Sequence, residues 1–115
     1  MTTDRDSDDG RAQPAVVDAA ERNRFEIVVD GQLAGFAEYR RRPGRIAFTH
    51  TEIDPAFAGR GLGGQLVSAA LSEARRDGLD VLPFCPFVRR WIEEHPRELD
   101  LVPAERRRQF GLPDC

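Results

Sequence analysis

Residues 54–64 read Asp54-Pro55-Ala56-Phe57-Ala58-Gly59-Arg60-Gly61-Leu62-Gly63-Gly64, a glycine-rich loop between a strand pattern and a helix pattern. Glycine lets backbone N–H groups approach an anion closely, and the first turn of a helix offers unpaired N–H donors with about half a positive charge. Arg60 adds a formal charge. The loop therefore predicts a phosphate-binding site made by Gly59, Arg60, Gly61, Leu62, Gly63 and Gly64.

The residues around this loop separate it from two common phosphate-binding motifs. Gly59, Gly61 and Gly64 formally match the G-x-G-x-x-G dinucleotide fingerprint. That fingerprint belongs to a parallel sheet with an acid at the end of the next strand, whereas the segments before this loop resemble hairpins and residues 81–84 are followed by Cys85. A P-loop needs Gly-Lys-Ser/Thr, and this chain contains no lysine.

The segments before the loop alternate with the period of β-strands. Phe25, Ile27 and Val29 share one face, and the following Asp-Gly at positions 30–31 is a strong signal for a two-residue hairpin turn. A return strand covers residues 33–39, with its register ending at the arginines 40–42, and Pro43-Gly44 predicts another turn. The sequence thus predicts a β-meander.

The third strand, residues 45–53, carries a polar pair next to the loop. Strand alternation places Ile46, Phe48, His50 and Glu52 on one face and Ala47, Thr49, Thr51 and Ile53 on the other. A polar pair that continues an apolar stripe indicates the mouth of a ligand cleft. The alternative is that His50 is a surface or hydrogen-bonded histidine with no chemical role.

After the loop, residues 61–76 have helical periodicity, with an apolar stripe, arginines in the last turn and Gly78 as the terminating residue. A short strand, residues 79–84, follows, and a strand-helix-strand crossover makes it parallel to the His50 strand. Pro86 suits the first turn of a last helix, so Cys85 lies at that helix's N-terminus, a position that favours a reactive thiol. The alternative for Cys85 is a small buried hydrophobic residue.

The run from Ile53 through Pro55, Phe57, Gly59, Arg60, Gly61, Leu62 and Gly63 to Leu66 resembles the acetyl-CoA loop of the GNAT superfamily of N-acetyltransferases. Its pattern is Arg/Gln-x-x-Gly-x-Gly/Ala after a strand that ends hydrophobic-x-Pro. The first position of the pattern falls on Ala58, so one side-chain contribution is missing and Arg60 substitutes only in part. Residues 48–52 and 83–96 are similar to the short, single-domain GNAT-like subfamily, and the resemblance covers roughly residues 24–102.

The resemblance implies an α+β fold with a mixed, mostly antiparallel sheet and two main helices in the order β-β-β-α-β-α. It also implies acetyl-CoA as co-substrate, with its pyrophosphate on the loop and its pantetheine arm between the two splayed strands. In the subfamily, the histidine before the loop and the cysteine after the next strand are proposed for chemistry, and they match His50 and Cys85. We expect Glu52 to orient His50, and Ile53 to contribute to the cofactor site.

The length and the net charge of the chain limit its domain organisation and its possible partners. The chain of 115 residues predicts one domain, residues 23–103, between a disordered acidic N-terminal tail, residues 1–22, and a helical or frayed C-terminal extension, residues 104–115. The net charge of −3 gives a nucleic-acid role little support. Neither a membrane span nor a disulfide framework is predicted, so we expect a monomer in the reducing cytoplasm.

The resulting hypothesis is an acetyl-CoA-dependent N-acetyltransferase that acts on a primary amine of a small molecule or a protein. His50 is the candidate base for direct attack, and a covalent variant passes the acetyl group through Cys85. The competing hypothesis is a non-catalytic acyl-CoA-binding or protein-interaction module, because the chain lacks the N-terminal helices with which longer GNAT enzymes build an acceptor pocket.

Overall fold

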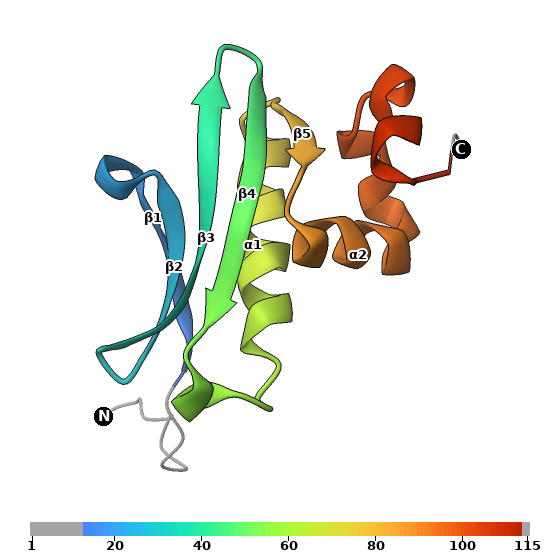
Figure 1. Ribbon diagram of the computed structural model, residues 1–115. Coiled ribbons are helices and arrows are strands. Elements are labelled where there is room, and N and C mark those ends of the chain that lie inside the picture. Colours follow the sequence, from blue (N-terminus) through green and yellow to red (C-terminus); the bar gives the residue numbers. More distant parts are fainter. Residues whose placement is uncertain (1–12, 114–115) are drawn as a thin grey trace, which may run out of the picture.

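Figure 1 shows the computed structural model, which describes residues 13–113. One sheet contains five strands in spatial order β1-β2-β3-β4-β5: β1 Ala15–Ala19, β2 Arg24–Val29, β3 Gln32–Arg42, β4 Arg45–Ile53 and β5 Asp80–Pro83. The first four strands pair antiparallel, and β5 pairs parallel to β4. The two α-helices are α1 Leu62–Arg76 and α2 Pro86–Glu94. The α+β class, the mixed sheet and the two main helices are as predicted.

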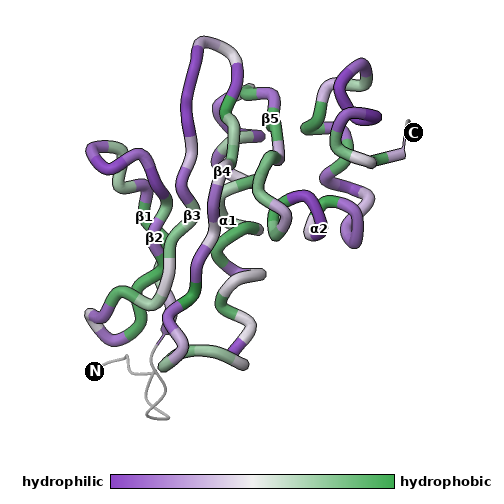
Figure 2. The backbone as a smooth tube through the Cα atoms, viewed as in Figure 1, coloured by the Kyte–Doolittle hydropathy of each residue, from purple (hydrophilic) through white to green (hydrophobic). Residues whose placement is uncertain are grey.

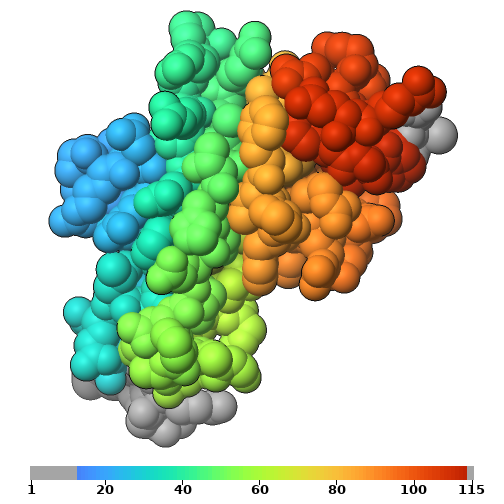
Figure 3. Space-filling view, in the orientation of Figure 1, coloured from blue at the N-terminus to red at the C-terminus, as the bar shows by residue number. Residues whose placement is uncertain are grey.

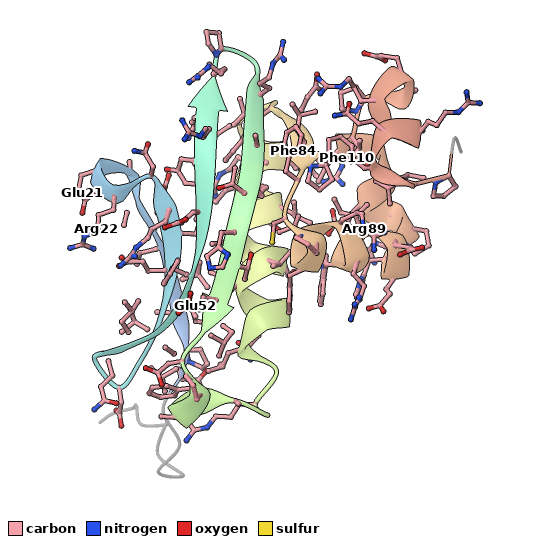
Figure 4. All side chains as sticks on the ribbon, in the orientation of Figure 1. Glu21, Arg22, Glu52, Phe84, Arg89 and Phe110 are labelled. Atoms are coloured by element: carbon pink, nitrogen blue, oxygen red, sulfur yellow. The ribbon has the colours of Figure 1, made fainter. Side chains whose placement is uncertain are left out.

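Short 3₁₀ helices fill the connections and the C-terminal part of the described chain. They are η2 Ala20–Arg22, η3 Pro55–Phe57, η4 Pro96–Leu101, η5 Ala104–Arg106 and η6 Arg108–Phe110. The predicted extension 104–115 is helical in η5 and η6, and it packs on the domain because Phe110 and Leu112 are buried. The Phe110 ring meets the Phe84 ring edge-on at 5.0 Å (Figure 4). Cys115 lies outside the described residues.

The N-terminal prediction needs a correction. A disordered tail was expected over residues 1–22, but β1 and η2 occupy its last part, while residues 1–12 lie outside the described residues. β1 pairs with β2 along its whole length, Ala19 is buried, and the Tyr39 hydroxyl donates a 2.5 Å hydrogen bond to Asp18. The strand was missed because two valines between alanines and an aspartate are a short hydrophobic signal, and its backbone hydrogen bonds come from the neighbouring strand β2.

The β2–β3 hairpin has the turn that the sequence predicts, and it contains a bulge that the sequence did not indicate. Asp30 and Gly31 have φ angles of 57° and 77°, as the predicted two-residue turn requires. Leu33 pairs with Val28 and Gly35 with Ile27, so Ala34 is an additional, bulged residue. The bulge turns Ala34 into the core and leaves Leu33 43% exposed.

A second bulge changes the face on which His50 lies. Glu38 pairs with His50 and Tyr39 with Phe48, which leaves Thr49 as the additional residue in β4. Phe48 is buried against the core, whereas the His50 and Glu52 side chains are 53% and 60% exposed. The prediction that His50 and Glu52 continue the Ile46–Phe48 stripe is therefore wrong, because one inserted residue reverses the strand alternation.

Helix α1 covers one face of the sheet and closes the core. Its buried side chains follow the predicted stripe: Leu62, Leu66, Val67, Ala70, Leu71 and Ala74. Figure 1 looks onto the opposite face of the sheet, where no helix of the described chain lies over the strands. We call this the outer face. Both His50 and Glu52 belong to it, and their side chains are exposed there.

Candidate active site

The loop between β4 and α1 is held in one conformation by its own residues. Asp54 accepts the Ala56 N–H at 2.9 Å and so caps η3. Gly59 and Gly61 have φ angles of 81° and 72°, a left-handed conformation that glycine adopts most easily. Gly61 is the N-cap of α1, and the first amide that bonds within the helix belongs to Gln65. The preceding amides of the first turn therefore remain available to an anion.

Arg60 lies beside this helix start. Its guanidinium sits 5.2 Å from the centroid of the Phe57 ring, a cation–π arrangement that holds the side chain next to the loop. The predicted phosphate site thus combines the N-terminus of α1 with one adjacent cation.

Gly63 and Gly64 also allow close packing between α1 and α2, a role that their position in the motif does not indicate. A Cβ atom on Gly63 would lie 2.7 Å from Cζ of Phe87, and one on Gly64 would lie 2.7 Å from Cζ3 of Trp91. The two glycines therefore let the aromatic side chains of α2 approach the first turn of α1. Sequence reasoning interpreted both only as cofactor residues.

A cleft of about 980 Å³ runs between α1 and α2. It begins at Gly61, beside the predicted phosphate site, and continues along both helices. Its lining residues are Gly61, Gly64, Gln65, Ser68, Ala69, Pro86, Phe87, Arg90, Trp91 and Glu94. Trp91 Nε1 is buried without a hydrogen-bond partner among the described residues. A mostly apolar cleft that ends at an anion site suits an elongated ligand with a phosphate group.

The strands β4 and β5 separate beside the loop. Their parallel pairing ends at Phe48 and Pro83, with one further bond from the Cys85 N–H to the Phe48 carbonyl at 2.8 Å. The Asp54 N–H donates to Ala34 on the β3 side, and the direction of backbone bonding alternates along a strand, so Thr51 and Ile53 present their backbone groups to the opposite side. β4 thus has an open edge from Thr51 to Ile53, with which β5 does not pair, and Figure 1 shows β4 continuing well beyond β5.

Cys85 lies where the open edge of β4 begins, next to Thr51. It is the N-cap residue of α2, with Pro86 at the first helical position as predicted, and it is 2% exposed. Its Sγ donates a 3.2 Å hydrogen bond to Oγ1 of Thr51. Thr51 was not singled out from the sequence, although strand alternation had already placed it on the face opposite His50.

His50 and Glu52 form a separate pair on the outer face. His50 Nε2 lies 3.0 Å from Glu52 Oε1, and the imidazole ring lies 6.1 Å from the ring of Phe36. Figure 4 shows Glu52 on the side of β4 that faces the viewer. The structure therefore joins His50 to Glu52 and Cys85 to Thr51, and these two pairs flank the open edge from opposite faces of the sheet.

Metal ligands and membrane-spanning helices are the two remaining features to consider within residues 13–113. No group of three or more histidine, cysteine, aspartate or glutamate side chains is arranged to hold a metal ion in this range. None of the helices described has the length and apolar character needed to cross a bilayer.

Comparison with known proteins agrees with this geometry. The family model of the GCN5-related N-acetyl-transferases matches residues 24–101, so the chain belongs to this family. Among solved structures, it is similar to the NMR structure of a "GCN5-like putative N-acetyltransferase" from Staphylococcus aureus, with a TM-score of 0.60 and 22% identity over 77% of this chain and 87% of that chain. A search of curated proteins found no match. The expected GNAT-like single domain is thereby confirmed, and family membership supports an acyltransferase-type function.

Proposed function

We propose that this protein transfers the acetyl group of acetyl-CoA to a primary amine. The observation that carries the proposal is the meeting of three features at one place: the N-terminus of α1, the cleft between α1 and α2, and the open edge of β4. The pyrophosphate binds at Gly59–Gly64 with Arg60 beside it, and the pantetheine arm pairs with the open edge near Ile53. The thioester then ends next to Thr51 and Cys85.

The reaction follows from the positions of the two side-chain pairs. The amine approaches from the outer face, where His50 takes its proton and Glu52 orients the imidazole. The amine nitrogen attacks the thioester carbonyl, the carbon–sulfur bond breaks, and CoA leaves as a thiolate that takes up a proton. Backbone N–H groups of the open edge stabilise the developing oxyanion.

In this mechanism, Cys85 does not carry the acetyl group. Its thiol is buried and donates to Thr51, and this arrangement favours direct attack by the amine over an acetyl-Cys85 intermediate. We expect Cys85 and Thr51 to form the inner wall that the acetyl group contacts. The protein acts as a monomer in the reducing cytoplasm, with acetyl-CoA and an amine acceptor as its partners and without nucleic acid.

The proposal is tested by CoA release from acetyl-CoA in the presence of a panel of amines, compared with the uncatalysed rate. His50→Gln should lower kcat/KM by about 100-fold or more, since general base catalysis contributes on that order. Arg97→Gln, an exposed change on η4, is the matched control and should leave the rate unchanged. Tight acetyl-CoA binding without CoA release from any amine would favour the binding-module hypothesis.

A further inference from the structure

A second, polar groove lies on the surface between η2 and the hairpin end of β3. Its volume is about 350 Å³, and its lining includes Arg22, Glu38, Arg40, Arg41, Arg42 and Thr49. Figure 3 shows the notch between the blue segment that contains η2 and the upper part of β3. In Figure 2, this part of β3 is continuously hydrophilic. The groove is separate from the cleft between the two α-helices.

The arginines of the groove differ in whether their guanidinium groups form ion pairs with acidic side chains. Arg22 donates to Glu26 at 2.8 Å, and Arg41 donates to Asp77 at 3.1 Å. In contrast, Arg40 has no ion pair within residues 13–113, and in that range Arg42 only donates to the Arg41 carbonyl at 3.5 Å. Residues two apart on a strand share a face, so Arg40 and Arg42 point the same way. Their two charges are available to an anionic ligand.

Glu38 is the one acidic residue of the groove lining, and it adjoins the proposed base. Glu38 is the register partner of His50, and Thr49 Oγ1 donates to the Glu38 carbonyl at 3.4 Å. Glu52 lies next to His50 on the same face. Two carboxylates, those of Glu38 and Glu52, therefore lie next to the residue that would take the proton of an ammonium group, and Arg40 and Arg42 lie further along β3. This order of charges is complementary to a molecule with an amine at one end and an acid at the other.

Strand geometry sets the spacing between the two ends. Arg40 lies two residues beyond Glu38, which is about 7 Å along an extended strand. The two groups of an α-amino acid are attached to one carbon and lie closer together than this spacing. A molecule whose two groups are further apart therefore matches the strand better. We propose, on the basis of the proposed transferase function, that the acceptor is an amine whose carboxylate or phosphate lies about 7 Å or more away and binds Arg40 and Arg42.

The first test measures binding without turnover. Backbone amide shifts of wild-type protein are followed by NMR during titration with 6-aminohexanoate, with its neutral analogue 6-aminohexanamide, and with 5-aminopentyl phosphate. Glu38, Arg40 and Thr49 should respond to an acid and not to the amide. Arg40→Gln/Arg42→Gln should weaken that binding at least about tenfold, since charge-assisted hydrogen bonds are lost. Arg97→Gln/Arg108→Gln removes the same charge from the exposed C-terminal part and should change nothing.

The second test is CoA release with the same three amines. Wild-type protein should prefer an acid to the amide by at least about tenfold in kcat/KM, and the Arg40→Gln/Arg42→Gln variant should lose this preference through KM. If acid and amide bind and react equally, or if the variant retains the preference, the acceptor inference is wrong while the transferase function stands. If the acids bind selectively but no amine releases CoA, the transferase function fails while the groove stands.

Discussion

Gly64→Ala tests whether the first turn of α1 depends on close contact with α2. The added methyl group would lie 2.7 Å from Cζ3 of Trp91, well inside the optimal contact distance of about 3.5 Å. If the Trp91 ring turns aside, it loses its stacking on His95 at 3.7 Å, and His95 is itself held by its Nδ1, which lies 2.7 Å from the Trp91 carbonyl. Overpacking costs about 2 kcal/mol and alanine gains about 1 kcal/mol of helix propensity over glycine, so we expect a net loss of about 1 kcal/mol.

The neighbouring glycine supplies the control. A Cβ atom at Gly63 would lie equally close to Cζ of Phe87, but that side chain is 43% exposed and its ring can move toward solvent. Gly63→Ala should therefore change the free energy of unfolding by less than about 0.5 kcal/mol, because helix propensity offsets the smaller packing cost. Urea denaturation of the two variants and wild type measures both values. Equal stability of the two variants, or a Gly64→Ala protein as stable as wild type, would refute the packing argument.

Three further predictions concern the inner wall, the outer face and the N-terminal strand. Cys85→Ser should reduce kcat less than tenfold with acetyl-CoA affinity nearly intact, whereas a loss of several orders of magnitude would establish the covalent route. Burial raises the pKa of Glu26, but hydrogen bonds from Arg24 and Arg22 outweigh it and hold the pKa below its ordinary value of 4.5. The stability that Glu26 contributes is therefore present above pH 4.5 and lost as the pH falls through the folded-state pKa, and Glu26→Gln should flatten this part of the pH–stability curve measured by thermal melting. Deleting residues 1–22 should lower Tm by several degrees, because β1 and the Asp18–Tyr39 hydrogen bond are lost; an unchanged Tm would show that β1 contributes nothing.

Local sequence signals predicted the parts of the fold that local chemistry determines. The turn at Asp30-Gly31 needs left-handed backbone, and the N-cap at Gly61 does too, so glycine at both places could be interpreted directly. The stripe of α1 and Pro86 at the start of α2 are equally local. These features fix the strand-loop-helix unit and the position of Cys85 after β5.

Features that depend on long-range pairing could not be predicted in the same way. The bulge at Thr49 arises from the register between β3 and β4, and it alone moves His50 to the outer face. Threonine at position 49 does not indicate a bulge, so the predicted strand alternation continued through this residue. β1 was missed for a different reason: it has only two β-branched residues, and its backbone is stabilised by pairing with the next strand, β2. The hydrogen bond between Cys85 and Thr51 likewise joins residues that only the crossover brings together.

The proposed binding position of acetyl-CoA can be measured directly. NMR amide shifts of the wild-type protein are followed while acetyl-CoA is added. We predict the largest shift changes at Leu62 and Gly63, the first two residues of α1, and at Thr51 and Ile53 on the open edge of β4. Gly61→Glu, which places a carboxylate at the phosphate site, should abolish these changes while the protein stays folded. Shifts confined to other parts of the chain, or unaltered binding by a folded Gly61→Glu variant, would contradict the account.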